Sequence, residues 1–98
     1  MTAQLRIYTI NRGMMDSWLT VFNEHIRPLH ERLGIPVVSS YVNADRTEFI
    51  WVRRFSNAEE IPDKEAAYFA SPERTALGDI PTSHIAKMEV TVMDEVVV

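Results

Sequence analysis

The chain has 98 residues, a formal net charge of −4, 46% hydrophobic and 24% charged residues, and no cysteine. This length fits one domain with one core, the negative charge argues against a nucleic-acid partner, and the lack of cysteine excludes disulfides and thiolate chemistry. No apolar run approaches the ~20 residues of a membrane span, and the first ten residues do not have the pattern of a signal peptide. We therefore expect one cytoplasmic domain over residues 1–98, with no membrane partner.

The first predicted element is a strand over residues 5–10, where β-branched and aromatic residues alternate with others. A helix is predicted from about Met14 to Leu33, because its apolar residues fall on one stripe roughly 100° wide. Gly34 and the Ile35-Pro36 pair end it.

The rest of the chain predicts two strands, a second helical region and a final strand. The strands cover about residues 37–43 and 47–55 and are joined by a tight turn. A helix is then expected to run to about Ala70, followed by a short helix in which Ser71 is the cap and Pro72 the first residue. Residues 80–83 are predicted as a loop and residues 84–93 as the last strand.

The order β-α-β-β-α-β predicts an α+β fold, a ferredoxin-like plait with a four-stranded antiparallel sheet and helices on one face. Strand alternation predicts which side chains face those helices. The set predicted to face the helices is Leu5, Ile7, Thr9, Ile50, Val52, Met88, Val90 and Val92. The set predicted to face away is Arg6, Tyr8, Ile10, Phe49, Trp51, Arg53, Phe55, Lys87, Glu89 and Thr91.

A chain of this length has nothing left to cover the second face of the sheet. On this prediction the uncovered face mixes aromatic and charged side chains, and a large exposed aromatic patch indicates a partner. The simplest partner is a second copy, packed sheet face to sheet face as a homodimer. Arg6 and Glu89 could pair in that interface, since the first and last strands are neighbours in this topology.

The segment "HIRPLH" places two histidines in the first helix, His25 and His30. Five residues on a helix correspond to about 140°, so the pair does not have chelating spacing and no metal site is expected. His25 shares the edge of the apolar stripe with Trp18 and Phe22, so it is predicted to face the space between helix and sheet. There it could be an axial ligand, a general base or a hydrogen-bond donor, or simply a half-buried imidazole bonded to a carbonyl. His30 is predicted to be a surface residue.

Other candidates have two interpretations each. Trp51 and Arg53 could line a pocket, with Arg53 binding a carboxylate or enolate, or they could form dimer packing and an ion pair. Tyr8 and Tyr41 could donate hydrogen bonds to a ligand, although buried interface tyrosines do so for structural reasons too.

Several short motifs over residues 5–93 resemble the NIPSNAP family: "LRIYTINRG", "FNEHIRPLHERLGI", "FIWVRRFSNAEE" and "YFASPE". Arg6 and Tyr8 match an Arg-x-Tyr pair of the first strand, and His25 and Pro28 match a histidine and a proline of the first helix. The resemblance implies a dimeric α+β barrel, two plaits joined by their sheets. It also implies a superfamily that includes cofactor-independent monooxygenases, haem-degrading monooxygenases and lactone isomerases.

The combined expectation is a small homodimer that binds an aromatic or enolate-like organic molecule without a cofactor, and that could be a cofactor-independent monooxygenase or isomerase. The expected catalytic residues are His25, Tyr8 and Arg53. The expected ligand-binding residues are Arg6, Trp18, Phe22, Tyr41 and Trp51. Two alternatives stay open: a haem-degrading monooxygenase with His25 as iron ligand, and a non-enzymatic binding or assembly module.

Overall fold

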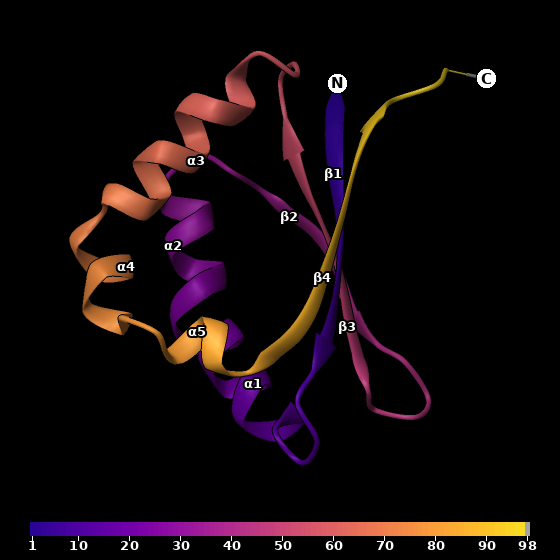
Figure 1. Cartoon of the computed structure of the whole chain (residues 1–98). Coiled ribbons are helices and arrows are strands. Elements are labelled where there is room, and N and C mark those ends of the chain that lie inside the picture. The colour runs from indigo at the N-terminus through magenta and orange to yellow at the C-terminus, as the bar shows by residue number, and fades with distance from the viewer. Residues whose placement is uncertain (98) are drawn as a thin grey trace.

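The computed structural model describes residues 1–97. Its strands are β1 (Thr2–Ile10), β2 (Val37–Val42), β3 (Glu48–Phe55) and β4 (Ile85–Asp94). They form one sheet in the order β2-β3-β1-β4, and each neighbouring pair is antiparallel (Figure 1). The strands β1 and β3 are therefore central, while β2 and β4 are the edges.

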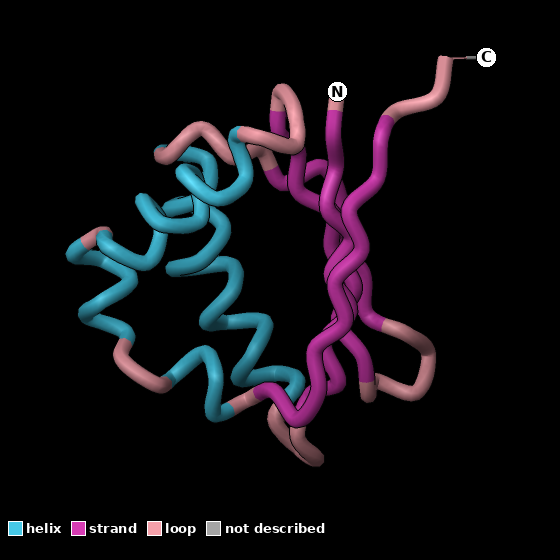
Figure 2. Tube along the Cα trace, turned by 45° about the horizontal axis from the view of Figure 1, so that its top comes forward, coloured by secondary structure: helices cyan, strands magenta, loops and turns pink. Residues whose placement is uncertain are grey.

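The helices lie on one face of this sheet (Figure 2). The segments α1 (Met15–Val21), η1 (Phe22–Ile26) and α2 (Arg27–Arg32) follow one another directly and form one helical rod, and α3 (Glu60–Ala70), α4 (Pro72–Leu77) and α5 (Ile80–Ser83) complete the layer. The predicted ferredoxin-like α+β fold is confirmed. No helix within residues 1–97 is long and apolar enough to cross a lipid bilayer.

Two short helices, α4 and α5, connect α3 to β4. The first was predicted and the second was not. The Ser71 hydroxyl accepts a hydrogen bond from the Arg74 amide at 3.2 Å, so Ser71 caps α4 as predicted. Residues 80–83 are not a loop but the short helix α5. Pro81 lies in its first turn, where the missing amide removes no helical hydrogen bond.

The core between the helical rod and the central strands is aromatic. Trp18 packs against Tyr8 and Phe49, with ring centroids 5.6 and 5.7 Å apart. Phe22 packs against Phe49 and Trp51, at 4.6 and 5.2 Å. Tilted and edge-on ring pairs add to the stabilisation that comes from buried area, so these contacts fix how the rod lies on the sheet.

The side chains of β1 and β3 alternate in the opposite phase to the prediction. Tyr8 and Trp51 are 5% and 2% exposed and face the helices, whereas Leu5, Ile7 and Val52 are only half-buried and face away. Both faces of the central strands carry large apolar residues, so alternation separates the faces without saying which one is covered. The same correction moves Ile10, Phe49, Arg53 and Phe55 to the buried side and Thr9 and Ile50 to the other side.

The apolar side chains of the edge strand β4 lie on the predicted side of the sheet, but the helices cover them poorly. Met88 lies opposite Tyr8 and so shares the helix side of the sheet. Met88, Val90 and Val92 nevertheless remain 45%, 45% and 52% exposed.

The predicted Arg6–Glu89 pair is wrong. Arg6 lies opposite Val90 on the helix side, while Glu89 lies opposite Ile7 on the other side. The sheet separates the two charged groups.

We call the side of the sheet away from the helices the bare face. Its centre is aliphatic, formed by Leu5, Ile7, Ile50 and Val52, which are direct cross-strand partners and only half-buried. Tyr41, the partner of Ile50 on β2, extends it and is 64% exposed. The prediction of a mixed aromatic and charged face is thus wrong at its centre, which is aliphatic, whereas the predicted charged residues Lys87 and Glu89 of β4 do lie on this face.

Candidate functional site

One wide turn in the helical rod decides which side chains face the sheet. Trp18, Phe22, Ile26 and His30 are all buried and follow one another at intervals of four residues. In a regular α-helix each four-residue step drifts by about 40°, which would leave His30 roughly 120° away from Trp18. The π-helical segment η1 contains one additional residue, which absorbs about 100° of this drift.

The two histidines of this rod therefore have exchanged roles relative to the prediction, which placed His25 toward the sheet and His30 on the surface. His30 is 1% exposed and faces the sheet. His25 is exposed and borders a surface hollow with Pro28, Arg32 and Glu73. The prediction that His25 faces the space between helix and sheet is wrong, because it assumed a uniform helical twist through η1.

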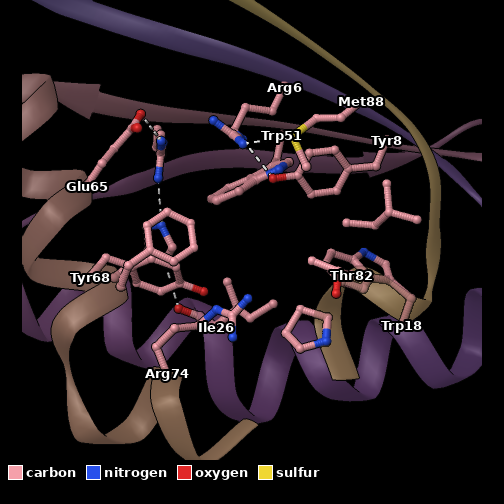
Figure 3. A pocket seen from close by; sticks show the side chains of 15 residues that line it. Arg6, Tyr8, Trp18, Ile26, Trp51, Glu65, Tyr68, Arg74, Thr82 and Met88 are labelled. Atoms are coloured by element: carbon pink, nitrogen blue, oxygen red, sulfur yellow. Dashed lines mark hydrogen bonds and ion pairs between the residues drawn. The ribbon is translucent and has the colours of Figure 1, made fainter. Parts of the chain in front are cut away.

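A cavity of about 90 Å³ lies between the central strands and the helices. Arg6, Tyr8 and Trp51 form its sheet side, and Trp18 and Tyr68 contribute to its helix side (Figure 3). Its lining includes three arginines and one glutamate. The cavity is therefore cationic, although the chain as a whole has a net charge of −4.

Arg53 is the centre of a buried polar network at one end of this cavity. It is 4% exposed, and its Nε donates to Gln4 Oε1 at 2.7 Å. Its Nη1 lies 3.0 Å from His30 Nε2, and its Nη2 pairs with Glu65 Oε1 at 2.7 Å. Burial is the main cause that lowers the pKa of Arg53, to about 10, so it stays charged at neutral pH. Each of its three nitrogens thus has one protein partner, which accounts for three of its five N–H groups.

The imidazole of His30 is neutral and holds one tautomer. Its Nδ1 lies 2.9 Å from the Ile26 carbonyl oxygen, which can only accept, so Nδ1 carries the hydrogen. Its Nε2 then accepts from Arg53. Burial first, and the nearby charges of Arg53 and Arg6 next, lower the pKa of His30 to about 4. His30 therefore supports Arg53 and has no lone pair free to take a proton from a ligand.

Arg6 differs from Arg53 in having only neutral partners. Its Nε donates to the Tyr8 hydroxyl at 2.7 Å, its Nη1 to Gln4 Oε1 at 2.8 Å, and its Nη2 to the thioether sulfur of Met88 at 3.1 Å. Within residues 1–97 no carboxylate lies at ion-pair distance from it.

Two hydrogen-bond donors in the cavity wall have no acceptor. The indole Nε1 atoms of Trp18 and Trp51 are buried, and no atom of the described chain accepts from either. A buried donor left unpaired costs about 1–3 kcal/mol, and such groups are rare in folded proteins. Both tryptophan side chains contribute to the lining of the cavity.

The structure brings five of the predicted site residues together: Arg6, Tyr8, Trp18, Trp51 and Arg53 all line the cavity. Three others lie elsewhere. Phe22 is buried in the core against Trp18 and Trp51. Tyr41 is on the bare face, and His25 is on the outer surface of the rod.

The lining residues that the sequence reasoning missed include four titratable ones, His30, Glu65, Tyr68 and Arg74. The four-residue repeat from Trp18 to His30 was a usable signal, because only a wide turn keeps such a repeat on one face. Glu65 and Tyr68 share a face of α3 with Ile61, although a lone glutamate on such a face did not indicate a buried arginine partner.

Within residues 1–97, no three side chains of histidine, aspartate or glutamate come together in a way that could hold a metal ion.

No protein-family model matches the chain, and no curated protein matches its sequence. Among solved structures, a NIPSNAP family protein from Agrobacterium tumefaciens has a TM-score of 0.89 at 13% identity, over 97% of this chain and 92% of that one. An uncharacterized NIPSNAP domain protein from Burkholderia xenovorans has a TM-score of 0.87 at 11% identity, over 98% and 95%.

A more distant likeness is to a putative antibiotic biosynthesis monooxygenase from Nitrosomonas europaea, with a TM-score of 0.68 at 13% identity, over 99% of this chain and 100% of that one. At such identities the likeness shows the fold. The chain thus has the fold of NIPSNAP family proteins, as its motifs implied, within a wider group of ferredoxin-like proteins.

Proposed function

We propose that this protein binds a small planar organic molecule, aromatic or enolate-like, in the cavity between its helices and sheet. The observation that carries the proposal is the pair of unpaired indole donors, Trp18 Nε1 and Trp51 Nε1, whose rings line a cavity with further aromatic side chains and three arginines. Aromatic walls favour a flat apolar body, and the donors favour oxygen acceptors on it. A volume of about 90 Å³ admits at most one ring, so any further part of the ligand would extend toward solvent.

The cavity is better suited to stabilising negative charge than to removing a proton. His30 is neutral with both nitrogens engaged, and Glu65 is paired with Arg53. Fixed cations and N–H donors in a partly dry site favour an oxyanion that develops during a reaction. If the protein is an enzyme, this supports a cofactor-independent isomerase or monooxygenase acting on an activated, enolate-forming compound. The fold it shares with a putative antibiotic biosynthesis monooxygenase agrees with that class.

A haem-degrading activity fits the residues poorly. His25, the ligand first considered, lies outside the cavity. His30 Nε2 already accepts from Arg53, and His84 Nε2 lies 2.7 Å from the Ser17 hydroxyl. The cavity is also far smaller than the several hundred Å³ typical of sites for larger ligands.

The bare face supports a homodimer. Its central residues, Leu5, Ile7, Ile50 and Val52, are aliphatic and only half-buried on one side of the two central strands. Packing this surface against the same surface of a second copy would remove it from water, which stabilises a symmetric pair.

The binding proposal can be tested by nitrogen-edited NMR, because the chain has two tryptophans and both line the cavity. Benzamide and benzoate, each with one ring and an oxygen acceptor, should shift the two indole N–H resonances in a saturable way. Trp18→Phe should weaken binding by about five- to tenfold, the worth of one hydrogen bond.

Tyr41→Phe is the matched control, since Tyr41 lies on the bare face, and it should leave the affinity unchanged. If neither compound moves either indole resonance at millimolar concentration, the binding proposal is wrong. Binding without turnover in assays of isomerisation and oxygen uptake would favour the non-enzymatic alternative.

A further inference from the structure

The two arginines on the sheet side of the cavity, Arg6 and Arg53, differ in how their charges are balanced. Arg53 is 4% exposed and paired with the Glu65 carboxylate. Arg6 is half-buried and donates to an amide oxygen, a hydroxyl and a thioether sulfur. Sulfur is a weak acceptor, so the Nη2 donor that contacts Met88 is the one most readily given to a stronger acceptor.

The two guanidinium groups are also held close to each other. Both donate to the same atom, Gln4 Oε1, at 2.8 Å from Arg6 and 2.7 Å from Arg53. The charge of Arg6 is one of the causes that lower the pKa of Arg53. With one carboxylate for two adjacent cations, a second anion would relieve this repulsion.

We infer that the ligand is a planar organic acid whose carboxylate binds Arg6 Nη2 in place of the Met88 sulfur. The inference rests on the proposed function and names the chemical class of its ligand. It also assigns the anion-binding role to Arg6 rather than to Arg53, which the sequence had favoured.

The surroundings of Arg6 suit a carboxylate that is attached to a ring. The Tyr8 hydroxyl accepts from Arg6 Nε, so its own hydrogen is free to donate to the same anion. The guanidinium carbon of Arg6 lies 5.5 Å from the Tyr8 ring centroid and 6.0 Å from that of Trp51. A ring placed against these aromatic groups would present its carboxylate to Arg6 on the Met88 side (Figure 3).

The test compares benzoate with benzamide, which has the same shape without the charge, by following the indole N–H resonances. The unchanged protein should bind benzoate about tenfold or more tightly than benzamide, as expected for a hydrogen bond to a charged group. Arg6→Gln should reduce that preference to about onefold. Arg12→Gln, which removes an exposed arginine outside the cavity, should keep it.

Two further variants guard against a folding defect in Arg6→Gln. Arg6→Lys keeps the positive charge and should retain a preference for benzoate of a few fold. Met88→Leu removes the sulfur that the carboxylate displaces, so benzoate should bind at least as tightly as before.

Equal affinity for both compounds, or a benzoate preference that survives in Arg6→Gln, would overturn the carboxylate inference while leaving the binding proposal intact. Failure of both compounds to bind would instead count against the binding proposal. The two failures are thus distinguishable.

Discussion

We expect His30 to make the stability of this protein dependent on pH. Its pKa in the folded protein is about 4, below the ordinary value of 6.5, so between these values the unfolded chain binds a proton that the folded chain does not. The free energy of unfolding should therefore fall as pH drops from about 6.5 to about 4, by up to about 3 kcal/mol. Denaturant titrations at pH 7.5 and 4.5 measure this difference.

His30→Gln should reduce this pH dependence, because an amide can keep both hydrogen bonds without titrating in this range. His25→Gln is the matched control on the exposed side of the same rod and should leave it unchanged. Equal pH dependence in all three proteins would contradict the assignment to His30.

Arg53 should contribute strongly to folding, since its removal leaves several buried groups without partners. Arg53→Met would leave Gln4 Oε1 and His30 Nε2 without their donor, and Glu65 without its counter-ion. We expect a loss of about 3 kcal/mol of unfolding free energy, at the low end for a buried pair because Glu65 is 32% exposed.

An exposed arginine of the helical rod offers a control for that substitution. Arg27 is exposed and lies outside the cavity lining, so Arg27→Met should change the unfolding free energy by less than about 0.5 kcal/mol. Equal effects of the two substitutions in chemical denaturation would show that the buried network contributes little.

At the scale of elements, η1 should make the helical rod tolerant of a deletion and intolerant of an insertion. Deleting the exposed Glu24 would let the rod become a regular α-helix, and Trp18 and His30 would then be eleven positions apart, about three turns plus 20°. Both would still face the sheet. We expect the deletion to cost less than about 2 kcal/mol, since only local packing changes.

An alanine inserted after Glu24 should be far more damaging, because the rest of the rod would turn by about a further 100°. His30 would leave its site beside Arg53, and an exposed residue would replace it. Near-ultraviolet circular dichroism and thermal unfolding of the two variants give the comparison, and an insertion that is tolerated as well as the deletion would refute this account of η1.

The elements also show what the sequence could and could not predict. The order of the strands and the longer helices followed from periodicity and turn residues, whereas the four-residue helix α5 was too short to show a pattern. Which side of β1 faces the helices could not be predicted, because Leu5 and Ile7 on one side and Tyr8 and Ile10 on the other are all apolar. The buried position of His30 could be predicted only with knowledge of the wide turn in η1. The partner of Arg53 could be predicted only with knowledge of how α3 packs against β3.

At the scale of the whole molecule, the bare face should control assembly. Ile50→Lys places a charge at the aliphatic centre of that face, so it should convert the proposed dimer into a folded monomer. Sedimentation velocity at micromolar concentration measures both states. Thr82→Lys, an exposed substitution on the helix side, should leave the dimer intact, and an unchanged protein that sediments as an 11.3 kDa species would refute the dimer.

The sheet separates the cavity from the bare face. Because the cavity is on one side of β1 and β3 and the bare face is on the other, two subunits joined by their bare faces would open their cavities in opposite directions. Neither cavity would then need a side chain from the other subunit. Calorimetric titration should accordingly give one ligand per chain without cooperativity, and the Ile50→Lys monomer should retain the affinity of the intact pair.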